Sequence, residues 1–188
     1  VFDWLWMPGY DDGHVAFYAI DEDAPGGLWT GVYTDLGGSL HTVADENTPV
    51  TGDGGTFVGF GLHVDIEGET VGFTGYSAGG WGLYLFDQAT RGITAAVDWN
   101  TPVPGGEGNF SQLSKVSVRG GNLAFLGWDD ADLKGLYARI DGVLFEVLDL
   151  NTLVDGRSIT DIDLRSAGFD GRSLAFQVEF DDFTYGVV

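Results

Sequence analysis

Residues 70–86 read TVGFTGYSAGGWGLYLF and hold two short motifs that recur along the chain. The first motif ends in Phe, and its copies are His14-Val15-Ala16-Phe17, Thr70-Val71-Gly72-Phe73, Asn122-Leu123-Ala124-Phe125 and Ser173-Leu174-Ala175-Phe176. The second motif begins with Gly and returns at intervals of 51, 53 and 51 residues, as Gly31-Val32-Tyr33, Gly82-Leu83-Tyr84, Gly135-Leu136-Tyr137 and Gly186-Val187-Val188. Two motifs that return in one order at a nearly fixed interval indicate tandem structural repeats.

A third motif, Asp-x-Asn-Thr, keeps the same interval and occurs three times, as Asp45-Glu46-Asn47-Thr48, Asp98-Trp99-Asn100-Thr101 and Asp149-Leu150-Asn151-Thr152. Together the motifs divide a single repeat domain, residues 1–188, into units of about 1–56, 57–109, 110–158 and 159–188. The fourth unit ends after its third predicted strand and has no copy of the third motif. We therefore expect an incomplete last repeat: either the chain is a fragment of a longer repeat protein, or another segment supplies the missing strand. An open sheet edge is an association hazard that proteins usually cover.

Within each unit, short runs of Val, Leu, Phe and Tyr alternate with clusters of Gly, Asp, Asn and Pro, which is typical of strands and turns. In the second unit the predicted strands are 58–66, 69–74, 82–86 and 92–98. No window has the 3.6-residue period of a helix, and the 31 glycines disfavour helices. A four-stranded antiparallel meander cannot bury both faces alone, so we predict an all-β, β-propeller-like array of about four blades. A solenoid is the alternative architecture.

Composition narrows the classes of partner. The chain has 29 acidic and 8 basic side chains, a formal net charge of −21, which disfavours nucleic acid and anionic membrane surfaces. No apolar run approaches the roughly 18 to 20 residues of a membrane helix, so we expect no direct membrane insertion. The absence of Cys excludes disulfides and thiol chemistry. Hydrophobic residues make up 44% of the chain, enough for a packed core.

The order of these motifs resembles a known family. The sequence x-x-x-Gly-x-x-(x)-Ala-Phe, then Gly-Leu-Tyr, then residues 98–110 (DWNTPVPGGEGNF), is similar to the tandem "NxxGxxxAF" repeats of exported bacterial proteins, many of which carry a C-terminal sorting anchor. The resemblance covers nearly the whole chain. It implies a propeller-like, extracellular or cell-surface protein, and it offers no catalytic residues to transfer to this sequence.

One catalytic motif is present, but its surroundings disfavour it. Residues 75–79 match Gly-x-Ser-x-Gly, the nucleophile elbow of α/β-hydrolases, with Ser77 as the nucleophile. That elbow needs a helix after the serine, and Gly79-Gly80-Trp81-Gly82 is a poor helix start. The three His residues, at 14, 41 and 63, occupy unrelated places in their units. We therefore predict a turn at Ser77 and name no catalytic residue.

The repeated Asp-x-Asn-Thr motif has two interpretations. Asp and Asn side chains can bond their own downstream backbone and close a turn at the exit of the fourth strand. The same oxygens are also suited to Ca²⁺, and the candidate ligands are Asp45, Asn47, Asp98, Asn100, Asp149 and Asn151. Ca²⁺ is the only cofactor that the sequence suggests, and no organic cofactor is expected.

The loops between the second and third strands of the units are acidic and aromatic. In a meander these loops emerge on the same face as the exit of the fourth strand. Carboxylates beside aromatic rings suit a carbohydrate, because the rings cover the apolar sugar face and the oxygens bond its hydroxyls. The alternative is that the rings only cap the blade cores. The candidate ligand-binding residues on this face are Trp29, Trp81, Trp128, Asp129 and Asp130.

Three functions follow from these observations. The first is a non-enzymatic extracellular or cell-surface module that binds matrix polysaccharide, Ca²⁺ or both. The second is a structural subunit that forms chains or filaments when a strand from a neighbouring copy completes the open fourth blade. A secreted hydrolase is the third, and the residues favour it least.

Overall fold

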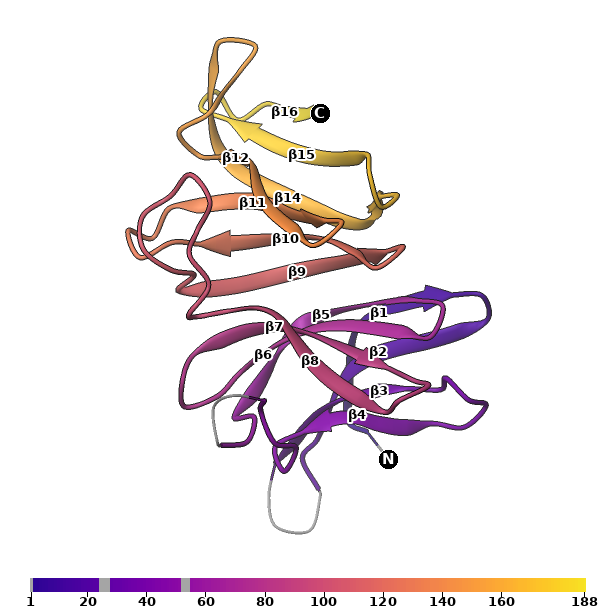
Figure 1. Cartoon of the computed structure of the whole chain (residues 1–188). Coiled ribbons are helices and arrows are strands. Elements are labelled where there is room, and N and C mark those ends of the chain that lie inside the picture. The colour runs from indigo at the N-terminus through magenta and orange to yellow at the C-terminus, as the bar shows by residue number, and fades with distance from the viewer. Residues whose placement is uncertain (1, 24–27, 52–54) are drawn as a thin grey trace.

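The computed structural model describes residues 2–23, 28–51 and 55–188, which form sixteen strands and no helix (Figure 1). The first antiparallel sheet contains β1 (Trp4–Asp11), β2 (His14–Asp21), β3 (Trp29–Thr34) and β4 (His41–Asp45). The second contains β5 (Gly59–Glu67), β6 (Thr70–Tyr76), β7 (Trp81–Asp87) and β8 (Gly92–Asp98). The third contains β9 (Gln112–Arg119), β10 (Asn122–Trp128), β11 (Lys134–Ile140) and β12 (Val143–Asp149). The fourth contains β13 (Leu153–Val154), β14 (Arg157–Phe169), β15 (Leu174–Phe180) and β16 (Tyr185–Val187).

The sheets are arranged as a propeller-like array, which confirms the predicted fold class. They follow one another in chain order in Figure 1, and each of the first three is a simple meander. The first strands of neighbouring sheets pack together, β1 on β5, β5 on β9 and β9 on β14. Met7 of β1, His63 of β5, Lys115 of β9 and Arg165 of β14 line one pocket of about 220 Å³, so all four inner strands converge there.

Each pair of neighbouring sheets shares a hydrophobic core. The first and second sheets enclose Val32, Ile66 and Phe73, among other apolar side chains. A second core lies between the second and third sheets, and a third lies between the third and fourth sheets. Every sheet thus buries apolar surface against its neighbours, which is why the fifty-residue unit must be repeated to be stable.

The two repeat motifs build one aromatic cluster in each of the first three sheets. In the third sheet Phe110, Phe125 and Tyr137 pack together, with the Phe110 and Tyr137 ring centroids 4.9 Å apart at 89°. The second sheet repeats this geometry with Phe57, Phe73 and Tyr84, and the first sheet with Phe2, Phe17 and Tyr33. The ring planes of the motif Phe and Tyr meet at 26° in all three. The three tyrosines therefore pack on the same pair of rings, as the repeat predicts, but Tyr33 is half-buried and meets Phe2 at 52° whereas Tyr84 and Tyr137 are buried.

The glycine two residues before each tyrosine makes room for its ring. A Cβ on Gly82 would lie 2.5 Å from the Tyr84 hydroxyl, and one on Gly135 would lie 2.6 Å from the Tyr137 hydroxyl. Residues two apart on a strand share a face, so the buried ring lies back over the glycine. This contact explains why the second motif begins with Gly.

The fourth sheet is also an antiparallel meander, but its strands are offset from those of the other sheets. Its strands β14, β15 and β16 correspond to the first three strands of the other sheets, because β15 carries the Phe motif and β16 carries Gly186. No described strand pairs with the outer edge of β16, and the fourth sheet reaches four strands through β13. The short β13, which was not predicted, pairs instead with the start of β14, Leu153 with Ser158 and Val154 with Arg157.

Candidate functional site

The Asp-x-Asn-Thr motif forms the same turn at all three of its copies. In residues 98–101, Asp98 Oδ1 accepts hydrogen bonds from the Asn100 backbone N–H (3.0 Å) and the Thr101 hydroxyl (3.0 Å). The Asp98 N–H donates to Thr101 Oγ1 in return. The motifs that begin at Asp45 and Asp149 repeat these three bonds. The turn interpretation is thereby confirmed, and Oδ1 of each Asp is in use, with Oδ2 of Asp149 also accepting the Asn151 side-chain amide at 3.5 Å.

The predicted Ca²⁺ ligands are distributed over three sheets. Asp45 and Asn47 follow β4, Asp98 and Asn100 follow β8, and Asp149 and Asn151 follow β12. Across residues 2–23, 28–51 and 55–188, no three His, Asp or Glu side chains form a group that could hold a metal ion. Ca²⁺ binding stays a prediction.

The predicted tryptophans likewise lie in separate sheets. Trp29 begins β3 and is 41% exposed, while Trp81 begins β7 and packs on Tyr76 with ring centroids 5.0 Å apart. Trp128 ends β10 and lies beneath Lys134, whose Nζ is 5.4 Å from its ring centroid. Within the described ranges no ring contact joins the three tryptophans.

Asp129 and Asp130 anchor the loop that joins the second and third sheets. Asp129 is only 2% exposed, and it accepts backbone N–H bonds from Glu107, Ala131 and Leu133. Asp130 accepts the Asn109 N–H at 3.0 Å. Burial alone would raise the pKa of Asp129, but the N–H bonds outweigh it and lower that pKa below its ordinary value. These residues hold the loop in place, a role that their sequence positions did not reveal.

The face predicted from the meander does exist in the third sheet. Asp129, from the β10–β11 loop, and Asp149 and Asn151, from the exit of β12, line one shallow pocket of about 420 Å³. Of the predicted ligand-binding and Ca²⁺ residues, these three meet there, and their binding role stays a prediction.

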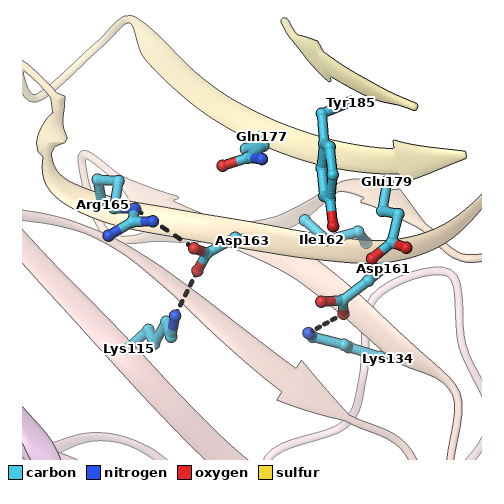
Figure 2. Close-up of a pocket in the computed structure, with 9 residues that line it drawn as sticks. All are labelled: Lys115, Lys134, Asp161, Ile162, Asp163, Arg165, Gln177, Glu179 and Tyr185. Atoms are coloured by element: carbon cyan, nitrogen blue, oxygen red, sulfur yellow. Dashed lines mark hydrogen bonds and ion pairs between the residues drawn. The ribbon is translucent and has the colours of Figure 1, made fainter. Parts of the chain in front are cut away.

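A second pocket lies along the fourth sheet, and the sequence did not indicate it (Figure 2). It has a volume of about 320 Å³, and we call it the fourth-sheet pocket. Its lining residues are Lys115, Lys134, Asp161, Ile162, Asp163, Arg165, Gln177, Glu179 and Tyr185. Lys134 joins it to the predicted face, because this residue directly follows the β10–β11 loop and covers Trp128.

Strand register explains why polar side chains gather in this pocket. Asp161 pairs with Glu179, and Glu179 pairs with Tyr185, so these three side chains form a row across β14, β15 and β16. Asp163 pairs with Gln177 in the next row along the same face. The opposite face of β14 and β15 is apolar and packs on the third sheet. The third sheet differs from the fourth in this respect. Its face at the positions that correspond to Gln177 and Glu179 is apolar, and that face packs on the fourth sheet.

Ion pairs organise the charged groups of the fourth-sheet pocket. Lys134 Nζ lies 2.5 Å from Asp161 Oδ1, while Asp163 is bonded by Lys115 Nζ and, at 3.3 Å, by Arg165 Nε. Burial alone would raise the pKa of Asp163, but the hydrogen bond and charge of Lys115, with the charge of Arg165, lower it below the ordinary value. Asp163 is therefore ionised at neutral pH and holds both cations.

A bulge in β9 brings Lys115 to this pocket. The pairing of β9 with β10 shifts register between Ser114 and Ser117, and Lys115 has a φ of 46°, in the left-handed region that side chains rarely adopt. Such bulges redirect side chains, often beside functional sites. The fourth-sheet pocket contains three of the eight Lys and Arg residues of the chain, but their separate positions in the sequence gave no signal that they meet.

Ser77 lies in the turn between β6 and β7, as predicted. Its backbone exchanges hydrogen bonds with Gly80, N–H to carbonyl at 3.0 and 3.2 Å, and its Oγ accepts the Gly79 N–H. The segment is strand, turn and strand, without the helix of a nucleophile elbow. In the part of the chain that the structure describes, there is also no helix long and apolar enough to cross a membrane.

Comparison with known proteins gives a structural likeness alone. No family model matches the chain, and no curated protein matches it. Among solved structures, it is similar to TolB from Acinetobacter baumannii, with a TM-score of 0.35 and 12% identity. The match covers 98% of this chain and 54% of that one, so the chain spans about half the length of that protein.

Proposed function

We propose that this chain is a non-enzymatic extracellular or cell-surface module that binds polysaccharide through the fourth-sheet pocket. The observation that carries the proposal is the row of Asp161, Glu179 and Tyr185 beside Lys134. Tyr185 is 63% exposed and offers a ring for the apolar face of a sugar. The ammonium, carboxylate and amide groups around it offer donors and acceptors for hydroxyls.

The shape of the pocket also favours a chain of sugars over a small buried ligand. It is an open depression on the polar face of β14, β15 and β16, with Lys115 and Lys134 of the third sheet at its edge, and it is not enclosed (Figure 2). Nearly all of its lining side chains are polar, so a hydrated ligand loses few of its hydrogen bonds on binding. Trp128 lies beneath Lys134 at one end of the pocket.

Binding of the whole chain to an array of neutral, acidic and amino polysaccharides tests this proposal. We expect a subset to bind, and we expect Tyr185→Ala to weaken that binding at least tenfold in a calorimetric titration. Tyr10→Ala is the matched control, because Tyr10 is 69% exposed on β1 and does not line the pocket. Equal losses in both variants, or no bound polysaccharide, would refute the proposal.

Assembly through the open edge of β16 is a second candidate function. This edge is apolar and exposed, with Val187 at 81% and nearby Phe183 at 82%, and such an edge can accept a strand. The partner in this proposal is a second copy of the chain. The Val188 N–H donates a hydrogen bond to the Phe176 carbonyl. Because N–H groups alternate in direction along a strand, the Val187 N–H points away from β15.

We expect the mass measured by light scattering to grow with protein concentration, and we expect Val187→Pro to abolish this growth. A constant monomer mass would exclude assembly.

Ca²⁺ is a further part of the proposed function, at the Asp-x-Asn-Thr turns of the first three repeats. Each Asp uses Oδ1 within its turn, and Oδ2 is the candidate ligand atom, although that of Asp149 also accepts a 3.5 Å bond from Asn151 Nδ2. A bound ion would raise the midpoint of thermal unfolding at low millimolar Ca²⁺. Screening of the net charge would raise the same midpoint only at a high salt concentration, and any salt would then do so. Melts in Ca²⁺ and in matched NaCl separate these outcomes.

A further inference from the structure

The charges of the fourth-sheet pocket are unevenly distributed along β14, and one end is positive. There Asp163 lies between two cations, Lys115 and Arg165, and both bond its carboxylate. One carboxylate cannot neutralise two cations, so this end has an excess positive charge. The Arg165 side chain is 76% exposed and bonds Asp163 through Nε, so its terminal N–H groups remain accessible to a ligand. Arginine presents such groups as a fork that matches a carboxylate.

The other end of the pocket is negative. Asp161 and Glu179 are direct partners in the register of β14 and β15, and Figure 2 shows their carboxylates side by side. Like charges placed directly opposite each other destabilise a sheet. Lys134 bonds Asp161, whereas the Glu179 carboxylate has no hydrogen bond or ion pair within the described ranges. A ligand ammonium group at this position would relieve the repulsion between the two carboxylates.

We propose that the fourth-sheet pocket binds a zwitterionic saccharide, one that carries an amino sugar next to a sugar acid. The amino sugar lies against Asp161, Glu179 and the ring of Tyr185, and the sugar acid lies against Lys115 and Arg165. The Tyr185 ring suits this arrangement for two reasons. It can cover the apolar face of a sugar, and it can attract a nearby ammonium group. This inference rests on the proposed polysaccharide binding and specifies its ligand.

The distance between the two ends favours a disaccharide. Strand residues rise about 3.3 Å each, so Asp163 lies about 7 Å and Arg165 about 13 Å along β14 from Asp161. The ammonium and carboxylate groups of an α-amino acid are attached to the same carbon and cannot span this distance. Adjacent sugars in an extended chain can place the two groups on separate rings.

Three tetrasaccharides provide the test, with the whole chain titrated at low salt. One is N-deacetylated heparosan, which alternates glucosamine with glucuronate and is zwitterionic. The second is its N-acetylated parent, which retains only the carboxylates, and the third is neutral cellotetraose. We expect the zwitterionic probe to bind at least tenfold more tightly than either of the others. We expect Glu179→Gln to remove this preference, while Glu69→Gln, an exposed and distant control, preserves it.

The outcomes distinguish this inference from the proposal on which it rests. Equal binding of the zwitterionic and neutral probes, or a preference that Glu179→Gln leaves intact, would overturn the zwitterion inference and leave polysaccharide binding standing. A failure of every tetrasaccharide and every arrayed polysaccharide to bind would overturn both. A preference that disappears in Glu179→Gln and persists in Glu69→Gln supports both.

Discussion

At the scale of single residues, the contact between a glycine and the tyrosine two positions later does most to define the blade. Gly135 and Tyr137 are both buried, and Tyr137 packs against Phe110 and Phe125 in a cluster that has no room to shift. The same contact recurs at Gly82 and Tyr84. The repeat is therefore conserved within the chain because the ring occupies the space of a missing side chain.

We expect Gly135→Ala to destabilise the protein by about 1 to 3 kcal/mol, the usual cost of overpacking a core. The new methyl group would lie 2.6 Å from the Tyr137 hydroxyl, so the ring would have to leave its position. Gly92→Ala is the control, because its nearest neighbour is Thr90 Oγ1 at 3.2 Å on an exposed turn. Urea unfolding followed by Trp fluorescence measures both variants. A Gly135→Ala protein as stable as the control would contradict the packing account.

At the scale of elements, a buried carboxylate ties the second sheet to the third. Asp65 of β5 is 2% exposed and accepts hydrogen bonds from the Val118 N–H, the Ser117 hydroxyl and Arg119 Nη1, all of β9. Burial raises the pKa of Asp65 above its ordinary value, although these bonds and the charge of Arg119 oppose the rise. A carboxyl whose pKa is higher in the folded state costs stability as pH rises through the ordinary Asp range.

Arg119→Met removes the charge that opposes this rise, so we expect its destabilisation to grow between pH 4 and pH 7. The growth is about 1.4 kcal/mol for each unit by which the folded pKa of Asp65 increases. Chemical unfolding of the variant and the parent at both pH values gives the difference. The double variant Asp65→Asn/Arg119→Met has no carboxyl to titrate, and its deficit should be independent of pH. An equal deficit at both pH values in the single variant would refute the role of Asp65.

The elements also show what could be predicted from the sequence. Strands β5, β6, β7 and β8 lie within two residues of their predicted bounds, because period-two patterns and turn residues are local signals. The Asp-x-Asn-Thr turns were predictable for the same reason. By contrast, the Lys115–Asp163 pair joins residues 48 apart, and it depends on the bulge in β9. Local patterns contain neither the bulge nor the pairing of β13 with β14, so the fourth-sheet pocket could not be derived from them.

At the scale of the whole molecule, basic side chains are clustered in one place although the net charge is strongly negative. The chain has a net charge of −21, yet three of its eight basic side chains meet where the third and fourth sheets adjoin. The net negative charge disfavours the approach of anionic polymers, and these cations offset it locally. The proposed preference for a ligand that also carries a positive charge rests on this distribution.

We propose above that ligands bind on the face of β14, β15 and β16 that carries Asp161, Glu179 and Tyr185. An NMR titration of the isotope-labelled chain with a bound polysaccharide fragment tests it most directly. We predict amide shifts that concentrate in β14, β15 and β16, together with a shift of the Trp128 indole N–H and none at Trp29. Shifts centred on Trp29 or Trp81, with the fourth sheet unchanged, would contradict the claim.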